Sequence, residues 1–311
     1  MRVTNSSLSN SLVDELNRLT ARQGRLQQQA ASGQRITAPE DDPAAMERVL
    51  ALRNENSNTA QYSQNIAVLK ERANNSFSAL QAVKTISDRA GEIATLADGT
   101  RSPQELQAYA AELTQMIKQA VDTMNTKYQG SYLFGGTMSD QQPFTIATDT
   151  NGNVTGVTYN GNTTVNSAEI DTGSTVSVDV PGANTTGTGP RGLVADSRTG
   201  ADFFNHLISL QNHLLAGDTA SISSTDRPGL QADEDNLIYQ VANNGAAQTR
   251  LDTAASVASD RTLSLQKMMS READADLTNT MVQLSQTQNA YQAALQSGAL
   301  IMRTSLLDYI Q

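Results

Sequence analysis

Hydrophobic residues recur at spacings of three and four in both terminal parts of the chain. Near the N-terminus these positions are Leu12, Leu16, Leu19 and Leu26, with Gln23 in the vacant position. A second helix is expected to begin after Pro43 and to run to about Leu96. A third is expected to begin at Ser102-Pro103, where serine is a good N-cap and proline fits the first turn. Stripes spaced near 3.5 residues predict helices packed side by side at shallow angles.

The C-terminal part follows the same spacing, but its register slips near Asp274 and Asp276, which predicts a break between two helices. The apolar positions after the break include Leu277, Met281, Leu284, Tyr291, Leu295 and Met302. Residues 277–302 contain no charged side chain, although a solvated helix normally carries charges on its outer face. We expect the N-terminal helix to cover one face and neighbouring copies to cover the other. An ordinary buried helix at the centre of a bundle is the alternative.

The middle of the chain has a different pattern. Residues 130–229 hold 14 of the 20 glycines, and β-branched residues alternate there with polar ones. Asn160-Gly161, which lies between such runs, predicts a hairpin, and a second turn is expected around Thr172-Gly173. The Gly- and Thr-rich loop 182–192 is expected to bury little and to tolerate substitution. Residues 201–216 are expected to be helical.

The predicted fold is therefore mainly α with a β-rich insert. Long coiled-coil-like helical rods from both termini pack together, and a central α+β or β domain is inserted between them. The expected organisation is a terminal helical assembly region (1–42 and 275–311), a long helical-bundle rod domain (43–135 and 230–274) and an inserted β-rich outer domain (136–229). Rods of this length are rare in compact enzymes and indicate a scaffold.

Composition narrows the function further. Charged residues make up 17% of the chain and the net charge is −10, which argues against a partner with a phosphate backbone such as nucleic acid. The absence of cysteine excludes disulfides and thiolate metal sites. The sequence contains no run of 18 apolar residues, so membrane insertion is not predicted. The N-terminal residues do not have the pattern of a cleaved secretory signal, so we expect either a cytoplasmic protein or export by another route.

Few residues are candidates for chemistry. Asp41 and Asp42 could form an acid–base pair or a metal site, but a helix cap before Pro43 explains them better. The two histidines, His206 and His213, are seven residues apart and not at the spacing of a helical metal site. We therefore expect no catalytic residue, no cofactor and no metal site, and the protein is predicted not to be an enzyme.

A possible calcium loop is the remaining candidate. Asp149, Asn151 and Asn153 match its first three ligand positions, but Val154 stands where the loop requires glycine. These three residues are interpreted as a turn.

Several short motifs occur near both ends of the chain and after the third predicted helix. The N-terminal motifs are Ser32-Gly33-Gln34-Arg35-Ile36 and Asp41-Asp42-Pro43-Ala44-Ala45. The C-terminal ones are Glu272-Ala273-Asp274-Ala275-Asp276 and Tyr291-Gln292-Ala293-Ala294-Leu295. Two more are Gly130-Ser131-Tyr132-Leu133-Phe134-Gly135-Gly136 and the ending Ser305-Leu306-Leu307-Asp308-Tyr309-Ile310. Together these motifs resemble the flagellin family of bacterial flagellar proteins, and the last two favour its hook–filament junction proteins over flagellin.

This resemblance implies a tubular or ring-shaped homo-oligomer in which the paired terminal helices line the core and the insert faces outward. It implies export of the unfolded chain through the flagellar type III apparatus and an extracellular location on the flagellum. The implied partners are another hook-associated protein on the hook side, flagellin on the filament side and an export chaperone.

Three alternatives remain at this point. The first is flagellin itself, which shares the terminal chemistry. The second is a non-flagellar helical stalk or signalling rod, although such rods usually carry alternating charges on their exposed faces. The third is an enzyme carried in the insert, for which the sequence offers no catalytic constellation.

Overall fold

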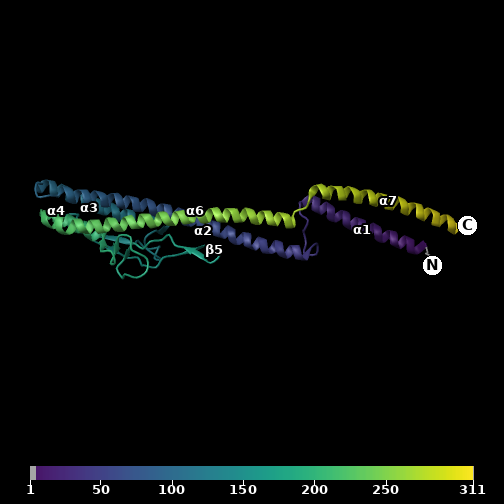
Figure 1. Ribbon diagram of the computed structural model, residues 1–311, viewed down its shortest axis with the longest axis horizontal. Helices are drawn as coiled ribbons and strands as arrows, with labels where there is room; N and C mark the ends of the chain where they lie inside the picture. Colours follow the sequence, from purple (N-terminus) through teal and green to yellow (C-terminus); the bar gives the residue numbers. More distant parts are fainter. Residues whose placement is uncertain (1–4, 311) are drawn as a thin grey trace. The chain divides into compact units, whose positions relative to one another are not determined.

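The computed structural model describes residues 5–310, with side chains from 10 to 300, and the chain forms two compact units. The first unit contains residues 1–58 and 260–311, and the second contains residues 59–259. Helices α2 (Pro43–Leu96) and α6 (Arg227–Ala273), which Figure 1 labels, contribute residues to both units. The boundaries between the units thus fall inside helices, whereas the three predicted regions end near helix ends.

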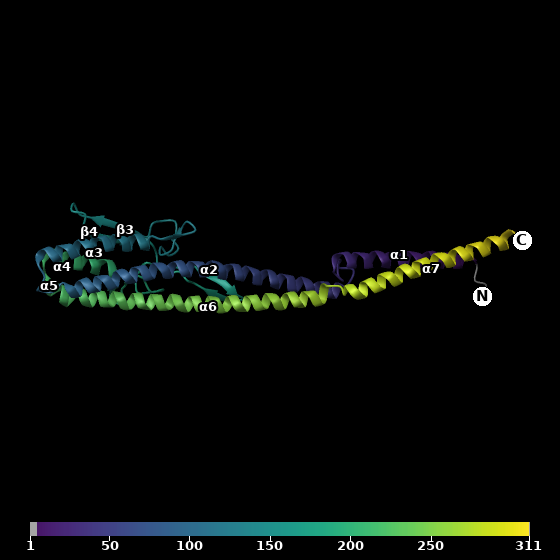
Figure 2. The ribbon, with the colours of Figure 1, turned by 90° about the horizontal axis from the view of Figure 1, so that it is seen from above.

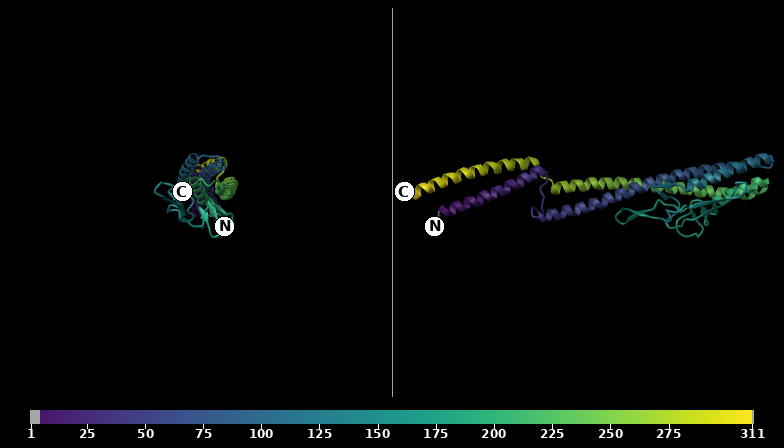
Figure 3. Two further views of the ribbon diagram at one scale, coloured as in Figure 1. Left: turned by 90° about the vertical axis from the view of Figure 1, so that its left-hand side faces the viewer. Right: turned by 180° about the vertical axis from the view of Figure 1, so that it is seen from behind.

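The first unit is built around the two terminal helices. Helix α1 (Asn5–Ser32) and helix α7 (Leu277–Ile310) lie side by side, as the front and back views show (Figures 1 and 3). The unit also contains the beginning of α2 and the end of α6, which Arg261 joins through an ion pair with Glu55 at 2.6 Å. Its buried apolar residues include Leu26, Ile36, Ala45, Val49, Leu265 and Ala273.

Shorter helices join α2 and α6 in the second unit. Helix α3 (Pro103–Met124) begins with a capping box, in which Ser102 accepts a hydrogen bond from the Glu105 amide and Glu105 accepts one from the Ser102 amide. Helix α4 (Phe203–Ala216) is followed by α5 (Thr219–Ser221) and by a π-helical turn, η1 (Ile222–Asp226), that leads into α6.

The strands of the second unit are short and form four small sheets. Strands β1 (Lys127–Tyr128) and β2 (Ser131–Tyr132) pair antiparallel, as do β3 (Phe144–Thr148) with β4 (Val154–Tyr159) and β5 (Ala168–Asp171) with β6 (Ser174–Val176). Strand β8 (Ala195–Asp196) pairs parallel with β7 (Ala183–Asn184) and antiparallel with β9 (Ala201–Asp202). Figure 2 shows β3 and β4 beside α3.

Two hydrophobic clusters hold the second unit together. The larger joins α2, α3 and α4 to the strands and includes Leu113, Ile117, Phe134, Phe144, Phe203 and Leu207. The rings of Phe144 and Phe204 lie 5.4 Å apart, so the β3–β4 hairpin is fixed directly to α4. The smaller cluster packs Ile170 and Val176 of the β5–β6 hairpin against Ile66 of α2 and Leu251 of α6.

The predicted fold class and its helices are confirmed. Helix α2 covers residues 43–96, α3 begins after Ser102, α4 lies within 201–216, and the helices separate between Ala273 and Leu277. The turn around Thr172-Gly173 is confirmed as the connection of β5 to β6.

The hairpin predicted at Asn160-Gly161 is wrong. Strand β4 pairs instead with the preceding strand β3, in a register that places Phe144 opposite Tyr159. The turn between them is closed by Asp149, whose carboxylate accepts hydrogen bonds from the amides of Asn151 and Asn153 at 2.9 and 2.8 Å. The interpretation of these three residues as a turn is therefore confirmed.

The expectation that loop 182–192 buries little is also wrong. Asn184 is fully buried there and donates to the carbonyl oxygens of Thr188 and Pro190 at 2.6 and 2.7 Å. Its side-chain oxygen accepts from the amides of Thr186 and Gly187. One asparagine therefore organises the loop, which makes this position intolerant of substitution.

Candidate functional site

The N-terminal stripe faces the interior of the first unit. Leu12, Leu16 and Leu19 are half-buried and Leu26 is buried, while the residues between them on α1 are mostly exposed. Gln23, in the vacant position of the stripe, is half-buried as well. Since α7 is the helix that packs against α1, this stripe forms one side of the terminal helix pair.

The C-terminal stripe divides between two faces of α7. Leu284 and Tyr291 are half-buried and lie on the more covered face of the helix. Residues of this face recur at spacings of four and three; they are Thr280, Leu284, Thr287, Tyr291, Ala294 and Gly298. At Gly298 the pair is so close that a Cβ atom would overlap the side chain of Leu12. The covered face is thus made largely of small and polar residues, which a search for apolar side chains overlooks.

The other members of the C-terminal stripe lie on an exposed face. Leu277 is 50% exposed, Met281 58% and Leu295 46%. The side chain of Met302 lies outside the described residues. The structure therefore leaves an uncharged face of α7, which we name the free α7 face (Leu277, Met281 and Leu295), uncovered by the chain itself.

The family motifs around Arg35 meet the end of α6 at the base of the helix pair. The Arg35 amide donates to the Ala273 carbonyl at 2.6 Å, and the Ala275 amide donates to the Gly33 carbonyl at 2.8 Å. The Arg35 guanidinium donates to the Glu272 carbonyl at 2.9 Å and contacts Asp42 at 3.3 Å. The two terminal segments are thus tied together by backbone and side-chain hydrogen bonds.

Asp42 caps helix α2, as predicted, and Asp41 caps the turn before it. Asp41 accepts from the amides of Thr37 and Ala38 at 3.0 Å each, and these bonds lower the pKa of its carboxyl group. Asp42 accepts from the Ala45 amide at 3.0 Å, which likewise lowers its pKa, and Pro43 is the first residue of α2. Both carboxylates are occupied with backbone amides rather than arranged for catalysis.

The aromatic–glycine motif lies in the second unit, where it joins β2 to the β3–β4 hairpin. Phe134 is buried, and its carbonyl accepts from the Gly182 amide at 2.9 Å and from the Tyr159 hydroxyl at 3.0 Å. Burial raises the pKa of Tyr159 to about 12. Tyr132 is half-buried under the ammonium group of Lys127, 4.4 Å from the ring centre.

The two glycines of this motif are required by close approach of other backbone segments. A Cβ at Gly135 would lie 2.6 Å from the Met138 carbonyl oxygen. Gly136 has a φ of +67°, and a Cβ there would overlap the backbone of Asn162. The motif therefore acts structurally, by allowing three loops to meet.

The histidines pair with buried carboxylates. His206 Nδ1 lies 2.8 Å from Asp233, and His213 Nδ1 lies 2.7 Å from Asp226. The hydrogen bond to Asp233 raises the pKa of His206. Among the described residues, no three His, Asp or Glu side chains are grouped so that they could hold a metal ion. In the same part of the chain, no helix is long and apolar enough to cross a membrane.

Comparison with known proteins shows which proteins this chain is similar to. Residues 3–139 match the family described as the bacterial flagellin N-terminal helical region. This region covers α1, its capped junction with α2, helix α3 and the aromatic–glycine motif. The N-terminal part of the chain is therefore similar to the helical region of flagellins.

The relatives that match along almost the whole chain are more specific. The chain is 24% identical over 309 residues to flagellar hook-associated protein 3 of Salmonella typhimurium, across 94% of this chain and 95% of the relative. It is 23% identical over 282 residues to the protein of the same name from Escherichia coli, across 86% of each. The predicted resemblance to the hook-associated branch of the family is confirmed.

Solved structures show the same fold. FlgL of Bacillus cereus is 21% identical, with a TM-score of 0.56 across 71% of this chain and 99% of that one. FlgL of Xanthomonas campestris is 20% identical, with a TM-score of 0.56 across 69% and 98%. The two curated relatives are named as hook-associated proteins of the flagellum, and the two solved structures show the fold.

Proposed function

We propose that this chain is a structural subunit of the bacterial flagellum at the hook–filament junction, and that flagellin polymerises on it. Its nearly full-length similarity to proteins named flagellar hook-associated protein 3 supports this role. The aromatic–glycine motif, which favours the junction branch of the family, supports it as well.

The free α7 face is the observation that carries the proposal. In the single chain, α1 covers one side of α7, and Leu277, Met281 and Leu295 remain about half exposed. Exposed apolar residues in a segment without any charge are typical of a surface that another protein covers. We infer that neighbouring copies cover this face in a ring or tube whose core the terminal helices line.

Further partners follow from the position at a junction. One end of the assembly would contact another hook-associated protein and the other end would contact flagellin. Before assembly, an export chaperone would cover the free α7 face. The chain would be exported through the flagellar type III apparatus and act outside the cell.

Flagellin itself is the second candidate function, because the matched N-terminal region is described for flagellins. A filament subunit must polymerise on itself without limit, whereas a junction subunit forms a short zone. The two functions therefore differ in where the protein is found along the flagellum.

Immunogold labelling of isolated flagella tests the proposal. An epitope tag is inserted at the exposed residue Asn151, in the turn between β3 and β4. Gold in a single short band between hook and filament is the expected result. Gold along the whole filament would identify flagellin, and flagella without gold would exclude both functions. A tag at the exposed position Gln141, between β2 and β3, serves as an independent second site.

A further inference from the structure

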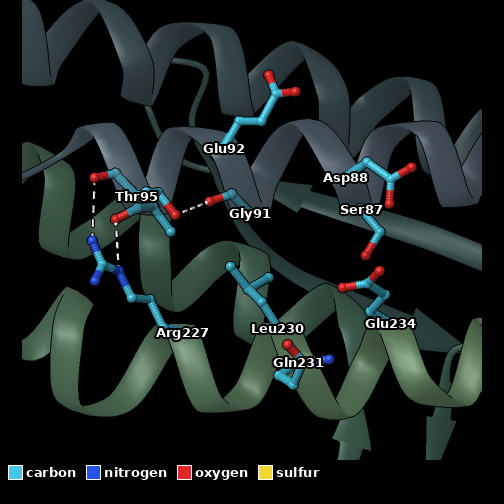
Figure 4. Close-up of a pocket in the computed structure, with 10 residues that line it drawn as sticks. Ser87, Asp88, Gly91, Glu92, Thr95, Arg227, Leu230, Gln231 and Glu234 are labelled. Carbon is cyan, nitrogen blue, oxygen red and sulfur yellow. Dashed lines mark hydrogen bonds between the residues drawn. The ribbon is translucent and has the colours of Figure 1, made fainter.

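A groove of about 490 Å³ lies between α2 and the beginning of α6, within the second unit. Its walls are formed by residues 87–95 and 227–234 (Figure 4). None of these residues takes part in the terminal helix pair or in the family motifs. The roles described so far therefore do not account for the groove.

The positive side chain of the groove is already engaged. Arg227 donates through Nε to the Ala94 carbonyl at 3.1 Å and through Nη2 to the Thr95 carbonyl at 3.2 Å. These carbonyls belong to the last turn of α2, where the carbonyl groups have no hydrogen-bond partner within the helix. Figure 4 shows the guanidinium at this end of the groove, away from Glu234.

The carboxylates of the groove are not equivalent. Asp88 is paired with Lys84 at 2.8 Å, and Glu92 is paired with Arg89 at 2.8 Å. In Figure 4 the Glu92 carboxylate points away from α6. Within residues 10–300 the carboxylate of Glu234 has no hydrogen bond and no ion pair, and the Lys84 ammonium, which bonds to Asp88, acts on it only through its charge.

A buried hydroxyl faces the same space from the opposite wall. Ser87 is only 3% exposed, and in the described part of the chain its hydroxyl makes no hydrogen bond, whereas many other helical serines and threonines bond to the preceding turn. Its side chain points toward α6, on the side of Glu234 (Figure 4). The hydroxyl oxygen is not sealed within the protein, so a donor that enters the groove can reach it.

The rest of the groove is small and apolar. At Gly91 an added Cβ would have no atom within 4 Å, so the glycine leaves open space rather than serving a close contact. Leu230 is almost fully buried beside it. This part could hold the aliphatic stem of a long side chain while its charged end reaches Ser87 and Glu234.

We propose that this groove receives an arginine side chain of an adjacent protein subunit. A guanidinium group presents donors in several directions in one plane, so it can serve a carboxylate and a hydroxyl on opposite walls together. Positive charge is complementary both to Glu234 and to the net charge of −10 of the chain. The identity of the neighbour as a flagellar subunit rests on the proposed function, whereas the binding of a guanidinium does not.

The first experiment measures binding to the isolated full-length chain. Butylguanidinium is titrated and the amide resonances are followed by NMR. We expect shifts confined to residues 87–95 and 227–234, and about ten-fold weaker binding in Glu234→Gln. Gly91→Met should block the groove, while Gly245→Met, also a helical glycine with no atom near an added Cβ, should bind as the wild type does.

The outcomes of the titration are decisive in both directions. Shifts that are absent at high butylguanidinium, or that persist unchanged in Gly91→Met, would overturn the groove as a binding site. Both glycine variants should stay folded, because a side chain in place of a helical glycine favours the helix. Helical content measured by circular dichroism checks this, and Glu234→Gln tests the site without any change in volume.

The second experiment identifies the source of the cation. A photoreactive amino acid is placed at Gln231, an exposed residue that lines the groove, in the host. Flagella are then isolated, and the cross-linked peptide is sequenced. A peptide of a neighbouring flagellar subunit with an arginine beside the cross-link supports the proposal. Cross-links without such an arginine, or none at all, overturn it. The gold label would still report the position of the protein, so failure here is distinct from failure of the proposed function.

Discussion

Met281→Asp separates folding of the chain from its assembly. Met281 is 58% exposed in the single chain, so the change should alter the free energy of unfolding by no more than about 0.5 kcal/mol. If neighbouring copies cover this residue, the remaining burial is worth roughly 1 kcal/mol, since full burial of methionine contributes about 1.5–3 kcal/mol. Covering an unpaired carboxylate costs several kcal/mol more. The contact between subunits should weaken by at least about 3 kcal/mol, roughly a hundred-fold.

The assay is complementation of a strain that lacks the gene. Met281→Asp should give bare hooks, although the purified protein has the helical content and unfolding midpoint of the wild type. Thr155→Asp is the matched control, because Thr155 is exposed on β4 in the insert that is expected to face outward. Normal filaments with Met281→Asp would refute the role of the free α7 face. Equal loss of filaments with Thr155→Asp would show that any added charge has this effect.

Three further changes test the second unit. Gly136→Ala should lower its free energy of unfolding by about 2–4 kcal/mol in a urea titration, because φ is +67° and the added Cβ overlaps Asn162; a loss below about 1 kcal/mol would contradict this. Ser102→Ala removes the N-cap of α3 and should cost about 1 kcal/mol in the same titration, so an unchanged midpoint would count against the capping box. The raised pKa of His206 means that its charge stabilises the fold below about pH 6.5 and that this contribution is lost as pH rises through the higher folded pKa. His206→Asn keeps a donor for Asp233 but does not titrate, so its urea midpoint should fall less between about pH 6 and pH 9 than that of the wild type; equal falls would contradict the assignment.

Local signals explain why the helices could be predicted from the sequence. Pro43 after Asp42 and Pro103 after Ser102 are start signals that act within one turn, and the structure begins α2 and α3 at these prolines. The pair Asp274 and Asp276 marks the break before α7 in the same way. The Asp276 carboxylate accepts from the Asn279 amide at 3.1 Å.

The pairing of the strands could not be predicted in the same way, because it depends on contacts between residues that are distant in sequence. Asn160-Gly161 has the composition of a hairpin turn, but Gly161 packs against Tyr159 and the carbonyl oxygen of Gly135. The partner of β4 is fixed by the turn at Asp149 and by the packing of Phe144 against α4. Neither contact can be recognised from the spacing of apolar residues.

The face of α7 that meets α1 could not be predicted from the sequence for a similar reason. Two seams run along this helix, one with larger apolar residues and one rich in small residues and threonine. The spacing of large residues selects members of both seams: Leu284 and Tyr291 lie on the seam that α1 covers, whereas Leu277, Met281 and Leu295 do not. On the covered seam Gly298 allows Leu12 to approach. A glycine in a helix interface permits close packing, which sequence hydrophobicity does not reveal.

Deletion of the gene in its host, followed by a search for flagellin in the culture medium, tests the junction function most directly. The proposed role predicts bare hooks together with abundant monomeric flagellin in the medium, because the filament subunit is made and exported but has no surface on which to polymerise. Bare hooks without flagellin in the medium would mean that this chain is the filament subunit. Filaments of normal length and attachment would contradict a structural role in the flagellum.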